Sequence, residues 1–476
     1  MPCASTIIPM NNVHYDLCVV GGGSGGSGAA CAPSRLGASV LLVEAGPGLG
    51  GTSTRAGVNN YEPVAGATGL PQEIFDRLKD IPDAVTLQRP WATYHPDRPW
   101  GWTKPADETD YRLSLSRRSG VPIVFEPDIL DRVMQDMLTD ADCRIVLKTR
   151  FTKVNYDREH IHSIVIEDPN GSKIVEANLF IDATADIHLA RAAGCRTAIG
   201  VEAREVYNEP TAPEQPELVL NNASLCYRVT PFKDDEPSQI QPLLDLIDIE
   251  RIRPVTSIRT YPNGDLNMNP LHMMSGVEAY ELGKSAYEEA EKRIYAHWHM
   301  LQTHYEFDRW RLVWISPMLG VRESYRLIGQ YVLREQDLET GLEAQTHPDI
   351  IAFADHALDF HGVRPSRQLT NGPYGIPFRC LRTKEIDNLL VACRGASFSS
   401  IAASSCRLSR TMMVLGQAAG TAAALFGKNV QHYDARALRD RLKQNGVALA
   451  LSEGYLEVMP GLTPLQTPRW LFLVQC

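Results

Sequence analysis

The chain has 476 residues, of which 44% are hydrophobic and 22% charged, and its formal net charge is −10. This length predicts two or three domains, and the negative charge argues against nucleic acid or an anionic membrane surface as a partner. The sequence has no signal-peptide pattern and no apolar run long enough to span a membrane. The ten cysteines form no CxxC pair, which is typical of free thiols, so we expect a cytoplasmic protein.

Residues 15–44 have the pattern of a β-α-β unit. The apolar run 15–20 (YDLCVV) suits a buried strand, a glycine-rich turn follows, and residues 39–44 (SVLLVE) predict a second strand. A helix of small residues should join the two strands and extend to about Leu36. Because Pro33 lacks an N–H group and its ring clashes with the preceding turn, we expect the helix to kink or end early there.

The glycine-rich turn predicts a dinucleotide site. Gly21, Gly23 and Gly26 satisfy GxGxxG, a pattern that a flexible Gly/Ser linker also satisfies. The flanking strands favour the dinucleotide reading, and Glu44 ends the second strand 23 residues after Gly21. The glycines allow the backbone to approach a pyrophosphate, the helix N-terminus attracts it, and an acid at that distance binds ribose hydroxyls.

The rest of the chain alternates strands with turns and then helices. Residues 88–102, rich in proline and aromatics, predict an irregular loop, and residues 208–216 predict a linker. Residues 276–305 predict one long amphipathic helix. Further strands are expected at 144–149, 151–157, 163–168, 173–184 and 388–393.

Several ordered segments resemble a known family. They are Gly50-Gly51-Thr52-Ser53-Thr54, FIDATAD at 180–186, GVRES at 320–324, GQYVL at 329–333, IDNLLVA at 386–392 and GQAAG at 416–420. With the first glycine turn, they resemble the FAD-dependent oxidoreductases of the glutathione-reductase-like superfamily. The match is closest to the bacterial family that begins with VVGGGxxG and ends with GQAAGTAAA. The resemblance implies an α/β fold, a split Rossmann-like FAD-binding domain with an inserted α+β substrate domain, and non-covalent FAD.

The resemblance also implies the residues that contact the cofactor. Ala185 replaces the family's usual glycine, and a helix beginning around 405–407 is expected to direct its positive N-terminus at the flavin. Arg394 and Arg407 could add positive charge or be ordinary ion pairs. The full set is Gly21, Gly23, Ser24, Gly25, Gly26, Glu44, Ala45, Gly50, Gly51, Thr52, Ser53, Thr54, Phe151, Ala183, Thr184, Ala185, Arg394, Ser405 and Arg407.

The expected domain division follows from these matches. Residues 14–60, 119–200 and 372–430 would form the discontinuous FAD-binding domain, and residues 201–371 a substrate or cap domain. Residues 61–118 would be an aromatic-rich loop region and residues 431–476 a C-terminal tail.

The last predicted helix carries a stripe of small residues. Gly416, Ala419, Gly420 and Ala423 fall at i, i+3, i+4 and i+7, so they share one face. We expect this face to pack against the sheet or against the first dinucleotide helix. An alanine at Gly420 should be tolerated, because it improves helix propensity.

The catalytic candidates are Arg322 and His361. Arg322 could orient an anionic or carbonyl group of the substrate or form a structural pair with Glu323, and His361 titrates near neutral pH and could act as acid or base. Two further groups could touch substrate, and loop packing is their alternative: Asn59, Asn60 and Tyr61, and the tryptophans Trp91, Trp100 and Trp102.

Other chemistries find little support. No HExxH occurs, so a metal site is not expected; no CxxxxC follows Gly51, which argues against a dithiol reductase; and no second GxGxxG indicates a built-in NAD(P)H domain. The sequence therefore predicts an FAD-dependent oxidoreductase acting on a small organic substrate by hydride transfer at flavin N5, with an unknown electron donor or acceptor. A flavin-dependent monooxygenase or halogenase and a non-catalytic FAD-binding redox sensor remain alternatives.

Overall fold

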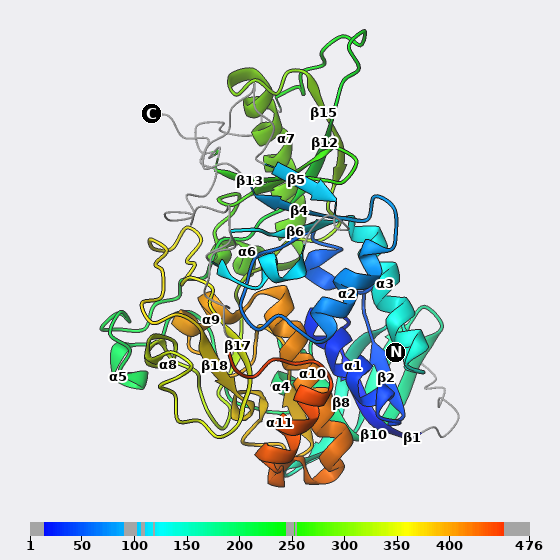
Figure 1. Cartoon of the computed structure of the whole chain (residues 1–476), viewed down its shortest axis with the longest axis vertical. Helices are drawn as coiled ribbons and strands as arrows, with labels where there is room; N and C mark the ends of the chain where they lie inside the picture. The colour runs from blue at the N-terminus through cyan, green and yellow to red at the C-terminus, as the bar shows by residue number, and fades with distance from the viewer. Residues whose placement is uncertain are drawn as a thin grey trace, which may run out of the picture.

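The computed structural model describes residues 14–89, 102–105, 110–117, 120–243, 252 and 255–451. Trp91 and Trp100 therefore lie outside the described residues, as does most of the predicted tail. A mixed α/β body forms the lower part of the molecule in Figure 1, and a smaller sheet with its helix stands above it.

The main sheet has seven strands in the order β7-β2-β1-β10-β9-β8, with β19 also pairing with β10. The strands are β1 (His14–Val20), β2 (Val40–Val43), β7 (Arg144–Val146), β8 (Arg150–Asp157), β9 (His160–Asp168), β10 (Gly171–Asp182) and β19 (Leu389–Val391). Residues 171–176 of β10 run antiparallel to β9, whereas residues 176–182 run parallel to β1. The predicted strands and the split Rossmann-like fold are confirmed, because β19 returns to the sheet more than 200 residues after β10.

Two helices of small residues pack against each other on this sheet. Helix α1 (Ser24–Arg35), blue in Figure 1, lies beside α10 (Ser409–Phe426), orange. The predicted small-residue stripe thus meets the first dinucleotide helix. The expectation that Pro33 ends α1 early is wrong, because Pro33 is already in the last turn and Leu36 N–H bonds to its carbonyl.

A second core lies in the inserted segment. Four antiparallel strands form it in the order β13-β14-β12-β15, and α7 (Ala286–His304) packs on them. The strands are β12 (Tyr227–Pro231), β13 (Thr256–Thr260), β14 (Leu266–Pro270) and β15 (Trp310–Ile315). The single long helix predicted for 276–305 is instead α6 (Gly276–Leu282), a short 3-10 turn and α7, because Gly283 adopts a φ of +53°.

The second core spans fewer residues than the cap domain predicted for 201–371. Its buried residues run from Ala223 to Phe307, whereas Leu327, Leu338 and Phe360 belong to the first core with the main sheet. The strands β17 (Ile350–Ala354) and β18 (Tyr374–Pro377) pair with each other across the expected boundary at 371.

Regular structure also occupies much of the region predicted as loop. Residues 61–118 contain α2 (Leu70–Lys79), whose buried Leu70, Ile74 and Leu78 recur at helical spacing. A further sheet has the order β3-β6-β4-β5, with β3 (Asn60–Tyr61), β4 (Val85–Arg89), β5 (Trp102–Pro105) and β6 (Ile123–Phe125). Helix α3 (Pro127–Asp140) packs against α1 and α2, whereas α11 (Ala435–Gln444), inside the predicted tail, packs against α10 and β17.

Within the described ranges, no helix combines the length and the apolar character needed to cross a bilayer. No group of three or more His, Cys, Asp or Glu side chains in these ranges could hold a metal ion. His297 of α7 is fully buried between the hydroxyls of Tyr227 (2.8 Å) and Thr256 (3.0 Å).

Candidate functional site

The first glycine turn is a close-packed cradle with one open side. A Cβ on Gly25 would lie 2.0 Å from the Ala392 carbonyl oxygen, and one on Gly26 would lie 1.7 Å from that of Gly21, so neither position accepts a side chain. A Cβ on Gly23, by contrast, would meet nothing within 4 Å. The crowding holds the turn against the strand ends, and the opening at Gly23 is where a ligand can approach the backbone.

The donors and the acid expected for a dinucleotide surround this opening. No side chain caps α1 at Gly23, and its first turn holds no acidic residue, so its N-terminal N–H groups are available to a phosphate. Glu44 follows β2, and its carboxylate accepts hydrogen bonds from the N–H groups of Gly22 (2.6 Å) and Gly46 (2.5 Å). These bonds place the carboxylate beside the turn with lone pairs left for ribose hydroxyls. Ala45, next to it, is exposed.

The second glycine segment links the first glycine turn to the start of α10. Gly50 and Gly51 have φ angles of +87° and +53°, which favour glycine, and Gly50 N–H donates to the Gly22 carbonyl (2.9 Å). Ser53 Oγ lies 3.1 Å from Ser409 Oγ, at the start of α10. Segments more than 350 residues apart in the chain therefore meet here. The neighbouring Thr54 is turned inward and donates to the Leu49 carbonyl.

The start of α10 differs from the expectation. The helix begins at Ser409, with Leu408 as an N-cap that offers no side-chain bond, and its first turn holds no acidic residue. Ser405 belongs to the separate helix α9 (Ser400–Cys406), where its hydroxyl bonds to the His356 carbonyl (2.5 Å) and to Tyr374 Oη (2.8 Å). The uncapped N-terminus lies at 408–410, and Ser405 does not line the cavity described below.

The segment after β10 completes the turn region. Ala183 N–H bonds to the Val20 carbonyl (2.8 Å), and Thr184 bonds to Asp182 through N–H (2.9 Å) and Oγ1 (2.7 Å). Ala185 has a φ of +65°, the left-handed region in which the family's glycine is unstrained. Burial raises the pKa of Asp182. Phe151, in β8, is half-buried against the first core.

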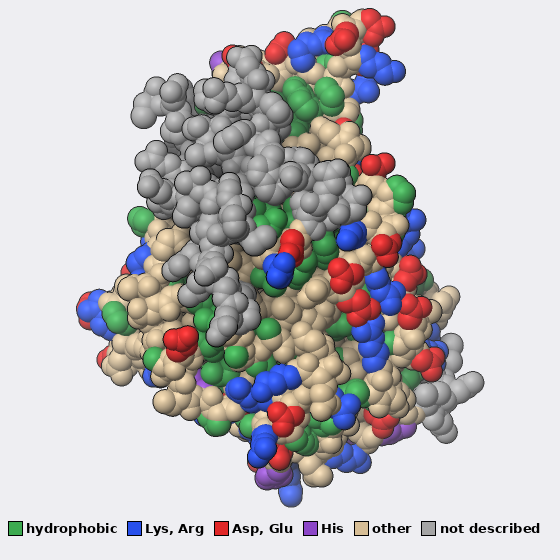
Figure 2. All heavy atoms as spheres, in the orientation of Figure 1, with side chains coloured by type: hydrophobic (Ala, Val, Ile, Leu, Met, Phe, Trp, Pro, Cys, Tyr) green, Lys and Arg blue, Asp and Glu red, His purple; other side chains and the backbone are tan. Residues whose placement is uncertain are grey.

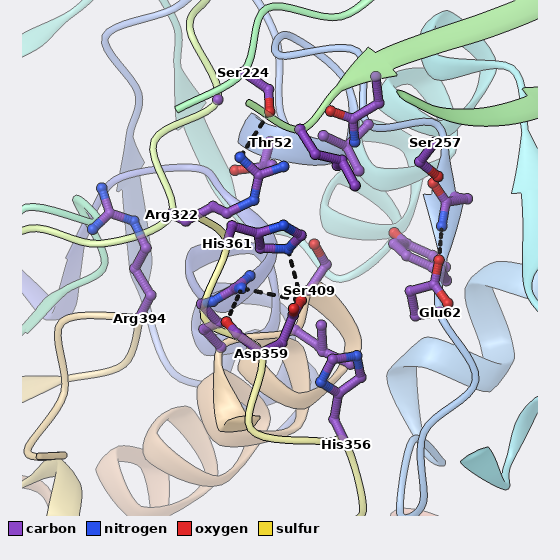
Figure 3. A pocket seen from close by; sticks show the side chains of 18 of the residues that line it. Thr52, Glu62, Ser224, Ser257, Arg322, His356, Asp359, His361, Arg394 and Ser409 are labelled. Atoms are coloured by element: carbon purple, nitrogen blue, oxygen red, sulfur yellow. Dashed lines mark hydrogen bonds and ion pairs between the residues drawn. The ribbon is translucent and has the colours of Figure 1, made fainter. Parts of the chain in front are cut away.

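A cavity with about 970 Å³ of empty volume, open solvent at its mouth included, lies beside Thr52 and the start of α10 (Figure 3). Its walls come from the second glycine segment, the inserted sheet, the loop 320–322, the loop 356–361 and the segment 394–410. The lining residues are Thr52, Val58, Asn60, Tyr61, Glu62, Ser224, Ser257, Asn269, Leu271, Gly320, Val321, Arg322, His356, Asp359, His361, Arg394, Arg407, Leu408, Ser409 and Arg410. Asn59 is fully buried, and its side-chain amide has no partner among the described residues.

His361 and Asp359 form a buried pair in this cavity. His361 Nε2 lies 2.6 Å from Asp359 Oδ2, and only 9% and 5% of the two side chains are exposed. Burial, together with the charge of Arg322, lowers the pKa of His361 to about 4. Burial alone would raise the pKa of Asp359, but His361 and Arg407 outweigh it and hold that pKa well below its ordinary value. At neutral pH the pair is therefore a neutral imidazole donating to a carboxylate.

Arg322 faces the same cavity. Its Nη1 donates to the Asn222 carbonyl (2.6 Å) and to Ser224 Oγ (2.7 Å), as Figure 3 shows for Ser224. The structural pair considered with Glu323 is not formed, since Glu323 binds Arg326 (2.8 Å) instead. Burial, followed by the charge of Arg407, lowers the pKa of Arg322 to about 10, so it remains a cation at neutral pH.

The other two arginines predicted to contact the cofactor, Arg394 and Arg407, line the cavity and each forms an ion pair. Arg394 binds Asp186 (2.6 Å), and Arg407 Nη2 lies 3.5 Å from Asp359 Oδ2. Sequence reasoning missed Asp359 and Arg410. Asp359 lies two residues before His361, a spacing that could have suggested the pair, whereas Arg410 gives no local signal.

Comparison with known proteins decides the family. The model of the FAD dependent oxidoreductase family matches residues 16–442. The chain belongs to this family. It is an enzyme with FAD as its cofactor, and the glycine cradle, the uncapped helix termini and Glu44 fit that group. No curated protein matches this FAD-dependent oxidoreductase.

Solved structures resemble the oxidoreductase at low identity. A geranylgeranyl bacteriochlorophyll reductase-like protein from Thermoplasma acidophilum has 13% identity and a TM-score of 0.47, over 91% of this chain and 84% of that chain. The p-nitrophenol 4-monooxygenase of Pseudomonas putida has 12% and 0.41, over 93% and 82%. A myxobacterial chondrochloren halogenase, a variant of FAD-dependent halogenases, has 12% and 0.41, over 90% and 78%. Sequence identities and TM-scores this low do not indicate which reaction the enzyme catalyses.

Proposed function

We propose that this enzyme oxidises or reduces a small organic molecule bound in the cavity beside Thr52 and Ser409. FAD, when bound, supplies the two-electron chemistry, which we propose to be hydride transfer at flavin N5. The observation that carries the proposal is the His361–Asp359 pair, which lies in a cavity walled by both the cofactor-type segments and the inserted sheet.

The pair can move a proton to or from the substrate. The neutral imidazole of His361 can accept a proton, and the Asp359 carboxylate beside its Nε2 then stabilises the imidazolium. Because Asp359 is ionised and held by Arg407, it also sets the orientation of the ring. Arg322 holds the polar end of the substrate beside this pair.

Anaerobic bleaching of the bound flavin by a metabolite library tests the proposal. A substrate should bleach the wild-type protein, and His361→Gln should slow bleaching by roughly 10²–10⁴-fold while FAD content is kept. His432→Gln, at an exposed histidine away from the cavity, is the matched control. A normal rate in His361→Gln would remove the acid–base role. Rapid oxygen uptake with an oxygen or halogen atom in the product would favour a monooxygenase or halogenase.

We add three further assignments to this proposal: the superfamily, the cellular location and the partners. We place the enzyme in the glutathione-reductase-like superfamily, which the return of β19 to the sheet supports. We propose a cytoplasmic location, supported by eight buried free cysteines in the described ranges. The proposed partners are the small-molecule substrate and a separate electron donor or acceptor. On the face shown in Figure 2, Lys and Arg side chains are interspersed with Asp and Glu side chains.

A further inference from the structure

The arginines of the cavity fall into two classes. Arg394 and Arg407 lie within 4 Å of a carboxylate, that of Asp186 and that of Asp359 respectively. Arg322 and Arg410 have no such partner anywhere in the described ranges. Two cationic side chains thus lie in the cavity wall with no carboxylate of the described residues within 4 Å, although the chain as a whole has a net charge of −10.

The two unneutralised arginines differ in how their donors are used. Arg410 is fully buried. Its two Nη atoms donate hydrogen bonds to Tyr111 Oη, to the hydroxyl and the carbonyl of Ser114 and to the Glu62 carbonyl. Arg322 makes its hydrogen bonds to the described residues through Nη1 alone. Its Nε and Nη2, which form one straight edge of the guanidinium, remain available. Such an edge matches the two oxygens of a carboxylate.

The anchoring of Arg322 pre-organises this edge. The Asn222 carbonyl and Ser224 Oγ hold Nη1 at 2.6 and 2.7 Å, so the plane of the guanidinium is fixed before any ligand arrives. Ser224 is itself held, since its backbone exchanges two hydrogen bonds with Gly320 (3.1 and 2.7 Å). A pre-oriented fork loses little side-chain entropy when it binds an anion. Figure 3 shows Arg322 next to His361.

We infer that the substrate of this enzyme carries a carboxylate, which binds side-on to Nε and Nη2 of Arg322 beside His361. This inference rests on the proposed function, because it places the anionic end of the reacting molecule in the same cavity. The bound carboxylate supplies the counter-charge that Arg322 lacks, and the His361 imidazole then faces the part of the substrate adjoining it.

The test is binding to the FAD-loaded protein, with no turnover required. Acetate, succinate, benzoate and phenylacetate are titrated against the neutral amides of the same skeletons, with the visible spectrum of the bound flavin and calorimetry as readouts. At least one carboxylate should bind more tightly than its amide. Arg322→Gln should raise the carboxylate Kd by about 10- to 100-fold, which is about 1.4–2.8 kcal/mol. Arg322→Lys should restore part of the affinity, because it keeps the charge without the fork.

Matched controls separate this role from others. Arg150→Gln, at an exposed arginine paired with Glu167 on the main sheet, should leave the Kd unchanged. The inference is overturned if no carboxylate binds up to its solubility limit, if acid and amide bind equally, or if Arg322→Gln alters only the flavin potential. Carboxylate binding without bleaching by any metabolite would leave the docking site standing and remove the proposed function. Bleaching by neutral metabolites alone would leave the proposed function standing and remove the carboxylate site.

Discussion

Pro33 of α1 and Gly420 of α10 lie directly against each other. A Cβ at Gly420 would stand 2.6 Å from Pro33 Cδ and 2.4 Å from the carbonyl oxygen of Ala29. That carbonyl is the one whose helical partner Pro33 cannot supply, because proline has no N–H group. The proline therefore leaves an acceptor on the surface of α1, and the glycine allows α10 to approach it. One turn earlier, a Cβ on Gly416 would likewise lie 1.9 Å from the Gly25 carbonyl oxygen.

The first prediction follows from this contact. Gly420→Ala should destabilise the enzyme by about 1–3 kcal/mol, because the methyl would meet a backbone oxygen and a proline ring that cannot move aside. The tolerance expected from helix propensity alone is therefore revised. Gly420→Leu should cost more and release FAD. Melting temperature and flavin content measure both, with Leu425→Ala, at a partly exposed residue of the same helix, as the control. A normal melting temperature for Gly420→Ala would contradict the packing.

The second prediction concerns the cofactor itself. The purified protein should be yellow, and acid should release intact FAD, because the cofactor-type segments hold it through glycine backbone, helix termini and Glu44. Chromatography of the acid supernatant identifies the flavin. Recovery of FMN, or flavin that stays with the precipitated protein, would be incompatible with non-covalent FAD.

The third prediction tests Glu44. Glu44→Ala should weaken FAD binding by about 10- to 100-fold, since charge-assisted hydrogen bonds to ribose hydroxyls typically contribute about 1.5–3 kcal/mol. The fold should persist, because the strand β2 is buried independently of this side chain. Titration of the apoprotein with FAD gives the Kd, and Glu167→Ala on the exposed side of β9 is the control. An unchanged Kd would show that Glu44 serves only the two backbone N–H groups it already binds.

The fourth prediction concerns acid stability. Burial lowers the pKa of His297 to about 3, so the folded protein keeps this imidazole neutral while the unfolded chain protonates it. Unfolding is therefore favoured as pH falls below about 6.5, at about 1.4 kcal/mol per pH unit for one such group, down to the folded pKa.

Urea unfolding at about pH 7.5 and about pH 5 measures this slope. His297→Gln should be less stable than wild type at the higher pH but lose less stability on acidification. His432→Gln, at an exposed histidine, should keep the wild-type slope. Equal slopes for wild type and His297→Gln would mean that the site accepts a proton when folded.

Much of the fold could be predicted because its signals are local. The strands β1 and β2, the glycine turn and Glu44 lie within one short segment, where apolar runs and turn glycines have a direct meaning. The break at Gly283 was missed because amphipathic spacing continues across it, and only the left-handed φ reveals it. The helix α2 was hidden by its aromatic surroundings, although its apolar spacing was present.

The candidate site was predictable only in part, because its chemistry depends on contacts across the chain. His361 and Arg322 were singled out by residue type and motif, but nothing local shows that Arg322 would bind Ser224 and leave one edge of its guanidinium available. The partner of His361 is Asp359, two residues away, and the pKa of Asp359 is lowered by His361 and also by Arg407, which is distant in the sequence. Ser405 was placed at a helix start that proved to be four residues later, since α9 and α10 are separate helices.

The meeting of α1 with α10 has a consequence for biosynthesis. The ribosome completes α1 at Arg35 and begins α10, which packs on it, at Ser409, 374 residues later, a delay of roughly 20–75 s at about 5–20 residues per second. During that interval the Gly/Ala face of α1 has no partner, and the nascent chain exposes it. We expect a chaperone to shield this face in the cell. A premature stop codon before Ser409 should give an aggregated, colourless product however much of the chain has been translated.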